Sequence, residues 1–340
     1  TPLYSSAASD VYKRQTVPRL LEKVYDKIVL KGRELTGIKR ALFFWALDLG
    51  LAYDVQGKNS GWYNFKLGIA RKLIFSKWQA ALGGNLVAIV CGSAALQPRL
   101  CRVFRAAGID VMEGYGLTET SPVISVNWKQ PEGVCLGTVG RLIDGVEVKF
   151  APDGEILVKG PNIMMGYYNK PELTAEVMTD DGYLKTGDIG EWVDDKFLKI
   201  TDRKKEIFKT SNGKYIAPQK NENLLKESVF IEQCMVVGEG EKYAAALIVP
   251  SAEGLTNWCK FKGISHSSVA EMIANEQVVE KINTEVEKCN AQLGQYEQIK
   301  KIAILPNPWT IDTGELTPTM KLKRKFINQK FAKEIASLFE

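Results

Sequence analysis

The stretch LVAIVCGSAALQPRLCRVFRAAGIDVMEGYGLTETSP, residues 86–122, decides the fold. It opens with the apolar run Leu86–Val90, which is typical of a buried strand. Residues Gln97–Ala107 continue with helical spacing and end at Gly108, a residue type that commonly caps a helix. Ile109–Met112 is a second short apolar run. Because a strand, a helix and a strand in this order form a βαβ unit, the stretch predicts a parallel sheet.

Upstream of this unit the apolar residues recur at intervals of three and four, which predicts helices. The first begins at Pro18 and is interrupted by Gly32 and Gly37. The second is predicted over Ala41–Tyr53 and the third over Leu67–Trp78.

Downstream of the unit the hydrophobic period changes to two, which predicts β-hairpins. Residues 146–158 alternate around a Pro-Asp-Gly turn, and residues 192–200 alternate around Asp194-Asp195. Charge then crowds into TDRKKEIFK, residues 201–209. Beyond it we predict strands over Cys234–Val237, Ala244–Val249 and Ile302–Leu305 and an amphipathic helix through Ile282–Tyr296.

We therefore predict an α/β protein with two domains. Residues 16–202 form the C-terminal portion of a large domain, which combines the parallel βαβ sheet with β-hairpins. Residues 203–340 form a small α+β domain, with a hinge near residue 205. We interpret residues 1–15, TPLYSSAASDVYKRQ, as a non-native scar, because they lack periodicity and read like a translated sequencing adaptor.

Composition excludes several classes of function. The 340 residues are 45% hydrophobic and 25% charged, which excludes disorder, and a net charge of +5 gives no strong indication of nucleic-acid binding. The single histidine, His266, excludes a His-rich zinc site, and the six cysteines form no C-x-x-C pair. The longest apolar run, Ala41–Leu47, is too short to span a membrane. We expect a cytoplasmic location; peripheral association with a membrane stays open, and the oligomeric state is unreadable.

The run EGYGLTETSP, Glu113–Pro122, carries the strongest chemical signal. It leaves the C-terminal end of a predicted strand, where open α/β sheets bind ligands. Its glycines let the backbone approach a ligand, Tyr115 offers a flat face to a base, and Thr118 can donate to a phosphate oxygen. Glu119 is an oxygen ligand suited to Mg²⁺. Alone, the run would be read more simply as a solvated loop with a capping threonine.

Three further runs add charge in a fixed order. YLKTGDIG sets Asp188 between glycines, where a carboxylate can accept two hydrogen bonds from a ribose diol or occupy a plain turn. TDRKKEIFK places Arg203 and Lys205 at the predicted domain joint, where a solvated linker is the simpler reading. TGELTPTMKLKRK places Lys321 in a tail that composition alone assigns to a solvated face and, second, to a nucleic-acid patch.

Taken together and in order, these runs resemble the adenylate-forming superfamily, specifically the long-chain fatty-acyl-CoA synthetases. The resemblance covers about residues 16 to 340. It is carried by YGLTETSP, GEILVKGPNIMMGYYNKPELT, YLKTGDIG, DRKKEIFK and LTPTMKLKR. It implies an AMP-forming ligase that converts a long-chain fatty acid, ATP and coenzyme A to acyl-CoA through an acyl-AMP intermediate, with Mg²⁺ as cofactor.

The resemblance also implies residue roles. Tyr115 would stack on adenine, Thr118 would touch the α-phosphate, Glu119 would hold Mg²⁺, and Lys321 would be the adenylation lysine. Lys205 would be the hinge. Lys321, Thr118 and Glu119 would be the catalytic residues. The ATP and AMP site would be lined by Gly92, Ser93, Ala94, Glu113, Gly114, Tyr115, Gly116, Thr118, Asp188, Arg203 and Lys321.

One departure limits the reading. The family's Gly/Ser/Thr-rich phosphate loop is absent from the sequence, so we expect an N-terminal truncation and no ligase activity from the 340-residue chain alone. The activity belongs to the intact parent protein. The alternatives are a non-catalytic nucleotide-binding relative and, with less support, a nucleic-acid binder that uses Lys321–Lys325, which lacks an aromatic platform.

Overall fold

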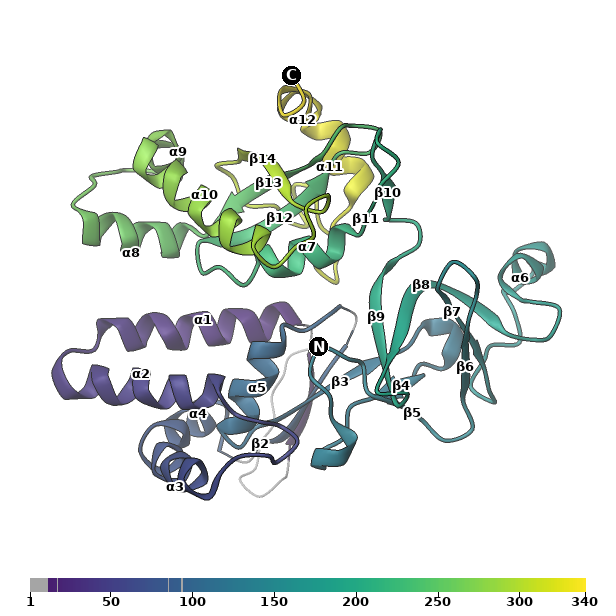
Figure 1. The fold of residues 1–340 in the computed structure, drawn as a ribbon, viewed down its shortest axis with the longest axis horizontal. Helices are drawn as coiled ribbons and strands as arrows, with labels where there is room; N and C mark the ends of the chain where they lie inside the picture. The colour runs from purple at the N-terminus through teal and green to yellow at the C-terminus, as the bar shows by residue number, and fades with distance from the viewer. Residues whose placement is uncertain (1–11, 17, 85, 93) are drawn as a thin grey trace. The chain divides into compact units, whose positions relative to one another are not determined.

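The computed structural model describes residues 12–16, 18–84, 86–92 and 94–340 (Figure 1). The described chain divides into two compact units. The first unit comprises the residues up to Thr186 together with Gly190–Ile200, and the second comprises Gly187–Ile189 and Thr201–Glu340. Each unit is described by itself below.

The first unit contains a five-stranded sheet in the order β1-β2-β3-β4-β5. Its parallel part confirms the predicted βαβ unit, because β2 and β3 pair in parallel, with Cys91 opposite Glu113. Two short antiparallel strands, β4 and β5, extend it. The strand bounds are β1 Tyr12–Thr16, β2 Leu86–Cys91, β3 Asp110–Tyr115, β4 Ser125–Val126 and β5 Arg141–Leu142.

Strand β1 falls within and just beyond the segment that the sequence suggests is a scar. It pairs in parallel with β2, with Thr16 opposite Cys91. The sequence analysis predicted no strand here, because YKRQT has neither alternation nor an apolar face. Residues 1–11 lie outside the described residues, so the interpretation of residues 1–15 as a scar stays a prediction.

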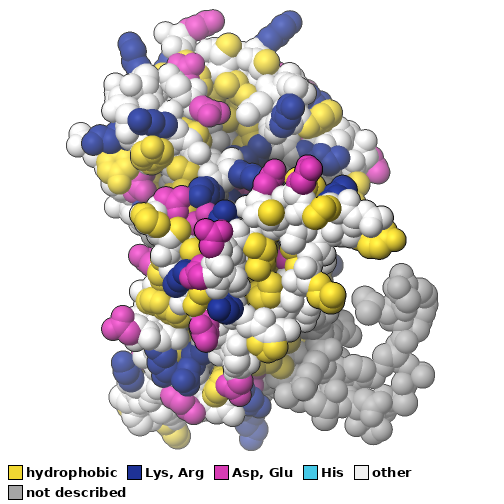
Figure 2. All heavy atoms as spheres, turned by 90° about the vertical axis from the view of Figure 1, so that its right-hand side faces the viewer, with side chains coloured by type: hydrophobic (Ala, Val, Ile, Leu, Met, Phe, Trp, Pro, Cys, Tyr) yellow, Lys and Arg dark blue, Asp and Glu magenta, His cyan; other side chains and the backbone are white. Residues whose placement is uncertain are grey.

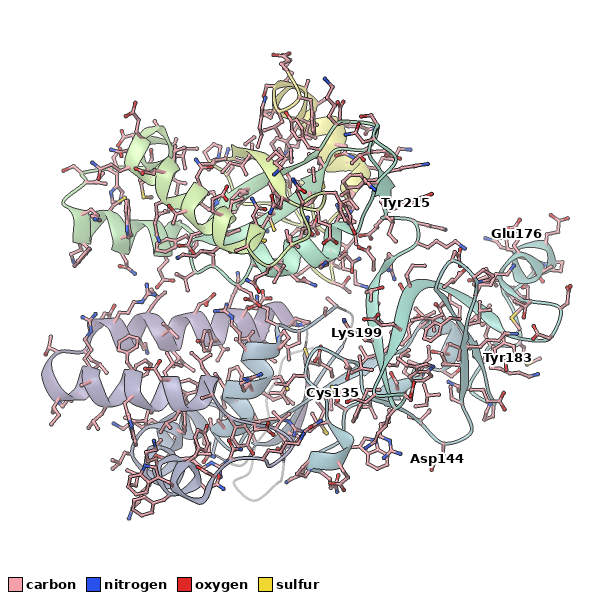
Figure 3. All side chains as sticks on the ribbon, viewed as in Figure 1. Cys135, Asp144, Glu176, Tyr183, Lys199 and Tyr215 are labelled. Carbon is pink, nitrogen blue, oxygen red and sulfur yellow. The ribbon has the colours of Figure 1, made fainter. Side chains whose placement is uncertain are left out.

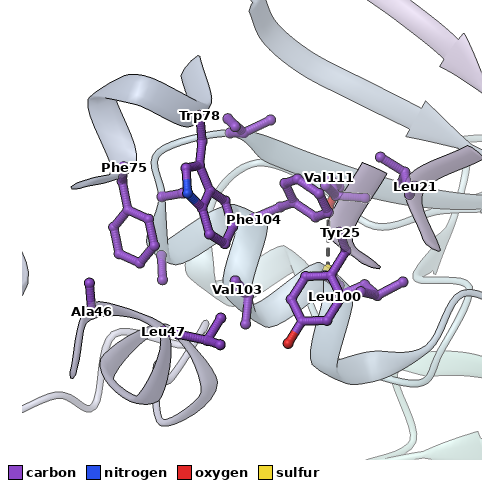
Figure 4. Close-up of a cluster of buried hydrophobic side chains, with 14 of the residues drawn as sticks. Leu21, Tyr25, Ala46, Leu47, Phe75, Trp78, Leu100, Val103, Phe104 and Val111 are labelled. Carbon is purple, nitrogen blue, oxygen red and sulfur yellow. Dashed lines mark hydrogen bonds between the residues drawn. The ribbon is translucent and has the colours of Figure 1, made fainter. Parts of the chain in front are cut away.

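The helices of the first unit pack around one apolar cluster (Figure 4). Phe75 and Trp78 meet edge to face with ring centroids 5.1 Å apart, and Trp78 meets Phe104 at 6.1 Å. Phe75 and Phe104 are completely buried, and a side chain of this kind contributes about 1.5–3 kcal/mol to folding. The helix bounds are α1 Pro18–Glu34, α2 Gly37–Leu51, α3 Gly61–Ala70, a π-helical turn Arg71–Phe75, α4 Ser76–Ala81 and α5 Pro98–Ala106.

The predicted interruption at Gly32 is wrong, because α1 continues to Glu34. A Cβ at residue 32 would lie 2.1 Å from the ring of Phe43. The glycine is therefore a packing requirement that lets α2 approach α1, and a single glycine does not break a helix that packing supports. Gly37 does separate the two helices, with a φ of 57°.

A second sheet of the chain has the order β6-β7-β8-β9. Strands β6 and β7 form the first predicted hairpin, with Val148 opposite Val158 and Gly154 in the left-handed region at φ 84°. At the second predicted hairpin Asp194 and Asp195 both have positive φ, as a two-residue hairpin turn requires. The bounds are β6 Glu147–Phe150, β7 Glu155–Lys159, β8 Leu184–Val193 and β9 Phe197–Arg203, with helix α6 Pro171–Val177 between β7 and β8.

The second unit is built on a three-stranded sheet, β12-β13-β14, buried on both faces. Alternate residues belong to different apolar clusters: Cys234 and Val236 join one, while Met235 and Val237 join the other. The first cluster takes residues from α7 to α10 and the second takes Ile327 and Leu338 from the C-terminal part. The strand bounds are β10 Phe208–Lys209, β11 Tyr215–Ile216, β12 Ile231–Val237, β13 Ala244–Pro250 and β14 Ile299–Ile304.

The helices of this unit differ from the prediction in two places. The helix predicted through Tyr296 ends at Asn290, whose side chain donates to the Ile299 carbonyl and accepts from the Ile299 N–H, both at 2.9 Å. The last residues of the chain, for which we predicted no helix, form two helices, one of which buries Ile327. The bounds are α7 Pro218–Leu225, α8 Ala252–Lys262, α9 Val269–Ala274, α10 Glu276–Asn290, α11 Arg324–Lys330 and α12 Ala332–Ser337.

The distribution of surface charge and the state of the cysteines agree with the small net charge and the absence of a C-x-x-C pair in the sequence. On the face drawn in Figure 2, basic and acidic side chains are mixed rather than segregated. The cysteines are free, and burial raises the pKa of Cys91 and Cys101 to about 12, so both behave as small apolar groups. Among the helices that the structure describes, none combines the length and the apolar character needed to cross a membrane.

Candidate functional site

The carboxyl ends of β2 and β3 bring the predicted glycines together. A Cβ on Gly92 would lie 3.5 Å from the carbonyl oxygen of Gly114, so the backbones after the two strands run close to each other. A Cβ on Gly116 would lie 1.6 Å from the carbonyl oxygen of Pro122. Only glycine fits there. The run therefore leaves the strand as the sequence predicts, at the edge where open α/β sheets bind ligands.

The turn after Gly116 is fixed by its own threonine. Residues Thr118–Thr120 form a single 3₁₀ turn. The buried Thr120 hydroxyl accepts from the Leu117 N–H at 2.9 Å and donates to the Pro122 carbonyl at 2.8 Å. Because Thr120 faces inward, Thr118 is exposed and Glu119 is half-buried.

A second segment, residues 162–167, fastens this turn from outside. Asn162 donates through Nδ2 to the carbonyls of Thr120 and Val123, at 3.0 and 2.7 Å. The Tyr167 hydroxyl donates to Glu119 Oε1 at 2.9 Å, and this hydrogen bond raises the pKa of Tyr167. This segment is part of the family pattern, but nothing local in the sequence links Asn162 or Tyr167 to Glu119, so neither residue has a predicted role.

Glu113 and Tyr115 point into the protein. The carboxylate of Glu113 accepts from the Leu96 N–H at 2.9 Å, and its other oxygen has no partner within the described part of the chain. Burial, only partly offset by that hydrogen bond, raises the pKa of Glu113 to about 8. Tyr115 is 8% exposed and belongs to an apolar cluster with Ile124 and Val146.

Strand β8 is anchored just before its start by Tyr183, which is labelled in Figure 3. Lys149 Nζ lies 4.0 Å and Lys159 Nζ lies 5.4 Å from the centre of the Tyr183 ring. The Tyr183 hydroxyl donates to Glu147 at 3.1 Å. Bonds from the β6–β7 hairpin thus hold the strand that carries Asp188.

Asp188 and Arg203 form an ion pair in the second unit. Arg203 Nε lies 3.1 Å from Asp188 Oδ1, and the Asp188 side chain is 5% exposed against 44% for Arg203. The Lys204 N–H donates to the carbonyl of Gly187 at 2.9 Å, which joins the two segments beside the pair. Both residues belong to the ATP and AMP site that the family resemblance implies, and their roles in it stay predictions.

Lys321 lies on a tight loop of the same unit. The Thr317 N–H donates to the Lys321 carbonyl at 2.9 Å, and the Lys321 N–H donates to Thr317 Oγ1 at 3.0 Å. The residue is exposed, but the protein around its ammonium group partly desolvates it. This desolvation and the nearby Arg203 lower the pKa of Lys321, while Asp188 and Glu206 act in the opposite direction. The ammonium is therefore an electrostatic neighbour of the Asp188–Arg203 pair.

The candidate residues fall into two described groups. Gly92, Glu113, Gly114, Tyr115, Gly116, Thr118 and Glu119 gather at the ends of β2 and β3, and the exposed Ala94 follows Gly92. Asp188, Arg203 and Lys321 gather in the second unit. Ser93 lies outside the described residues. Lys205 is exposed, in a turn where the Glu206 N–H donates to the Arg203 carbonyl at 2.8 Å.

Metal binding by the first group needs the phosphates of a nucleotide. The described residues contain no cluster of three or more His, Cys, Asp or Glu side chains that could hold a metal. Mg²⁺, however, is commonly bound by one or two carboxylates together with substrate phosphates. Glu119 fits that use, because Tyr167 orients its carboxylate by binding Oε1.

Comparison with known proteins identifies the family to which the chain belongs. A model described as AMP-binding enzyme matches residues 15–168, and a model described as AMP-binding enzyme C-terminal domain matches residues 205–340. Together these matches cover most of the chain. It belongs to the AMP-binding enzymes.

Within this family the chain is similar to curated long-chain-fatty-acid–CoA ligases, which confirms the predicted resemblance. It is 36% identical to one from Mycobacterium bovis over 95% of this chain and 54% of the relative. It is likewise 36% identical to long-chain-fatty-acid–CoA ligase 1 of Homo sapiens, over 95% of this chain and 47% of the relative. The chain thus spans about half the length of the curated relatives it matches.

Solved structures of the adenylation domains of carboxylic acid reductases show the same fold. The adenylation domain of a carboxylate reductase from Mycobacterium chelonae matches with a TM-score of 0.70 and 21% identity, over 96% of this chain and 46% of that chain. The corresponding domain from Segniliparus rugosus, solved with AMP and a co-purified carboxylic acid, matches with the same TM-score, 22% identity and the same coverage of both chains. At this identity the likeness concerns the fold alone.

Proposed function

We propose that the full-length protein containing this chain is an AMP-forming long-chain fatty acid–CoA ligase. It consumes a long-chain fatty acid, ATP and coenzyme A and releases acyl-CoA, AMP and pyrophosphate. The curated relatives support the substrate class through their names. The observation that carries the proposal is the Asp188–Arg203 ion pair, with Nε and Oδ1 3.1 Å apart, in the same unit as Lys321, whose pKa both residues influence.

The nucleotide would be held by both groups of residues. Gly92, Ser93, Ala94 and the segment Glu113–Gly116 would line the adenine, with Tyr115 stacked on it. Thr118 would donate to the α-phosphate. Asp188, as an ionised carboxylate, would accept two hydrogen bonds from the ribose hydroxyls, and Arg203 would keep it charged and oriented.

In the first half-reaction a carboxylate oxygen of the fatty acid attacks the α-phosphorus of ATP. The new P–O bond makes acyl-AMP, a carboxylic–phosphoric mixed anhydride; the bond from the α-phosphorus to the oxygen that bridges it to the β-phosphorus breaks, and pyrophosphate leaves with the electron pair. Both reactants are anionic, so alignment and positive charge supply most of the acceleration. The Lys321 ammonium would supply that charge.

Mg²⁺ is the cofactor that the family implies, and Glu119 is the carboxylate that would hold it. When bound, the ion would neutralise charge on the phosphates. The contribution of this chain is the orientation of Glu119 by Tyr167 and by the backbone bond from Met164 to the Glu119 carbonyl, at 2.8 Å.

In the second half-reaction the sulfur of coenzyme A attacks the acyl carbonyl carbon and AMP leaves. The thiol gives up its proton to solvent water, the new C–S bond replaces the bond from the acyl carbon to the phosphate oxygen, and AMP leaves with that electron pair. The ammonium of Lys321 has no part in this chemistry, and the pantetheine arm needs room to enter. We propose that rotation about Lys205, between the domains 16–202 and 203–340, serves one half-reaction in each orientation.

Lys321→Ala in the full-length protein tests the proposal. We expect the acid-dependent ATP–pyrophosphate exchange to fall by about 100-fold or more, the size of effect that follows loss of one transition-state charge contact. Coenzyme A transfer to preformed acyl adenylate stays near the original rate. Lys323→Ala, which removes an exposed lysine of the same tail, is the matched control. Equal loss of both half-reactions in Lys321→Ala would contradict the assigned role.

A non-catalytic nucleotide-binding relative is the alternative, and it is disfavoured because Glu119, Asp188, Arg203 and Lys321 all carry competent side chains. Binding of ATP without pyrophosphate exchange would support it. We keep a cytoplasmic location as part of the proposal; nothing supports peripheral association with a membrane.

A further inference from the structure

The second unit contains one arginine with two carboxylate partners from distant segments. Arg324, at the first residue of α11, points Nη2 at both oxygens of Glu222, at 2.7 and 2.8 Å. Its Nε lies 3.0 Å from Glu206 Oε2, and its Nη1 donates to the Val236 carbonyl at 3.3 Å. The guanidinium therefore uses all three of its nitrogens. The carboxylates outweigh burial and raise the pKa of Arg324.

The two carboxylate partners of Arg324 lie in different parts of the second unit, one in its buried body and the other beside the proposed hinge residue. Glu222, on α7, is 5% exposed and also accepts from the Val236 N–H at 2.8 Å, so it belongs to the body of the unit. Glu206 directly follows the proposed hinge residue and sits in the turn that begins at Arg203. Arg324 thus joins the body of the unit to the segment next to the hinge.

Arg324 also stands at the base of the loop that carries Lys321, three residues away. The loop closes on itself through the Leu316–Leu322 bridge, and the Lys323 N–H donates to the Glu315 carbonyl at 2.8 Å. At the other end of the chain of contacts, Glu206 is an electrostatic neighbour of the Lys321 ammonium. A displacement of Arg324 therefore moves the base of the loop relative to Arg203 and Asp188.

A partly buried ion cluster adds little net stability over well-packed apolar side chains, but a planar guanidinium with fixed partners specifies geometry. We propose that Arg324 is a positioning residue for the adenylation step: its bonds to Glu206 and Glu222 hold the Lys321 loop in fixed register with the hinge segment. The inference rests on the proposed function of Lys321. In this proposal Arg324, Glu206 and Glu222 position Lys321 and do not bind the nucleotide themselves.

The experiment uses Glu206→Gln in the full-length protein, because this change removes the negative charge that Arg324 meets on the hinge side and leaves the Arg324–Glu222 pair intact. We expect kcat of the acid-dependent ATP–pyrophosphate exchange to fall about tenfold, since small misplacements of a reacting group cost that much or more. The rate of coenzyme A transfer to preformed acyl adenylate stays within about twofold. Arg324→Lys keeps the charge but loses the two-pronged geometry, so it shows the same selective loss, enlarged.

Glu285→Gln is the matched control. Glu285 accepts from Lys281 and Lys288 at 2.7 Å on α10, so the variant weakens an ion cluster of the same unit that shares none of the residues of the Arg324 cluster. We expect it to lower the unfolding midpoint, as loss of an ion pair does, without separating the two half-reactions. If Glu206→Gln also slows both half-reactions equally, or neither, the positioning role is wrong.

Lys321→Ala, measured in parallel, separates the two proposals. A selective loss of exchange in Lys321→Ala with no selective loss in Glu206→Gln and Arg324→Lys overturns only the positioning role. No selective loss in Lys321→Ala overturns the proposed function itself. If Arg324→Lys fails to fold, the result of Glu206→Gln still decides the question.

Discussion

The turn that carries Thr118 and Glu119 and the loop that carries Lys321 are built on opposite plans. The turn is fastened along its length, by Thr120 from within and by Asn162 and Tyr167 from a separate segment. The loop is held by its own backbone bonds, by the Arg324 ion cluster at its base and by the Glu315–Lys330 ion pair. The turn is therefore held from a distant segment of the chain, whereas the loop is held at its base. Under the proposed function, the nucleotide would meet a preformed turn and the cation would come from a compact loop.

The largest effect that tests this difference is expected from Gly116→Ala. A Cβ there meets the Pro122 carbonyl at 1.6 Å, so the turn must shift as a whole. We expect a cost of about 1–3 kcal/mol in the free energy of unfolding, the usual cost of overpacking. We also expect AMP binding to the full-length protein to weaken by about tenfold or more, equivalent to about 1.4 kcal/mol. Calorimetry and denaturant unfolding measure both.

The control for this variant is Gly61→Ala, because a Cβ at residue 61 meets nothing within 4 Å at the start of α3. It leaves stability and AMP binding unchanged. Unaltered AMP binding in Gly116→Ala would show that the turn is adaptable, and the contrast between the turn and the Lys321 loop would lose its basis.

Two buried carboxylates extend the comparison to pH. In the first unit, burial raises the pKa of Glu113 to about 8, against an ordinary value of 4.5. The folded state then holds a proton that the unfolded state releases, so stability is greatest below pH 4.5 and falls as pH rises towards 8. Glu113→Gln keeps an acceptor for Leu96 and removes the titration. We expect the fall in unfolding midpoint between pH 5 and about 8 to flatten in Glu113→Gln and to persist in Glu172→Gln, at an exposed site.

In the second unit the same experiment on Asp202 is expected to show the loss of stability over a lower pH range than for Glu113. Burial raises the pKa of Asp202 to about 7; the Arg203 N–H lowers it, Glu206 raises it and Arg324 lowers it. Stability from this group is full below about pH 4 and lost as pH rises to about 7. Asp202→Asn therefore flattens the pH profile below about 7 and leaves the profile above it unchanged. If the stability of Asp202→Asn depends on pH over pH 4–7 as that of the original protein does, a group other than Asp202 takes up the proton.

Local patterns in the sequence predicted the parts of the fold that depend on neighbouring residues. The βαβ unit, the hairpin around Gly154 and the central strands of the second unit follow from hydrophobic period and turn residues. The end of α10 at Asn290 did not, because it depends on bonds to Ile299 in another element. Gly32 was misread for the same reason, since the contact that explains it comes from Phe43.

The candidate site divides in the same way. Order along the chain was enough to place Thr118, Glu119, Asp188 and Lys321 within a family pattern. It could not identify Tyr167 or Arg324, because their partners lie 48 and 102 residues away in the sequence and no local spacing records such a bond. Residues that hold others in place are therefore the ones that need coordinates.

The smallest effect is expected from Tyr167→Phe, which removes only the hydroxyl that orients Glu119. The ring stays, so stability changes by about 1 kcal/mol or less, the value of one hydrogen bond. In the full-length protein we expect the Mg²⁺ concentration for half-maximal ATP–pyrophosphate exchange to rise, because removing the partner of a metal ligand weakens metal binding by about 10-fold or more. Tyr168→Phe, on the neighbouring and 90% exposed residue, leaves it unchanged. An equal Mg²⁺ requirement in both variants would mean that the turn holds Glu119 without Tyr167, and the preformed side of the comparison would then rest on Thr120 and Asn162 alone.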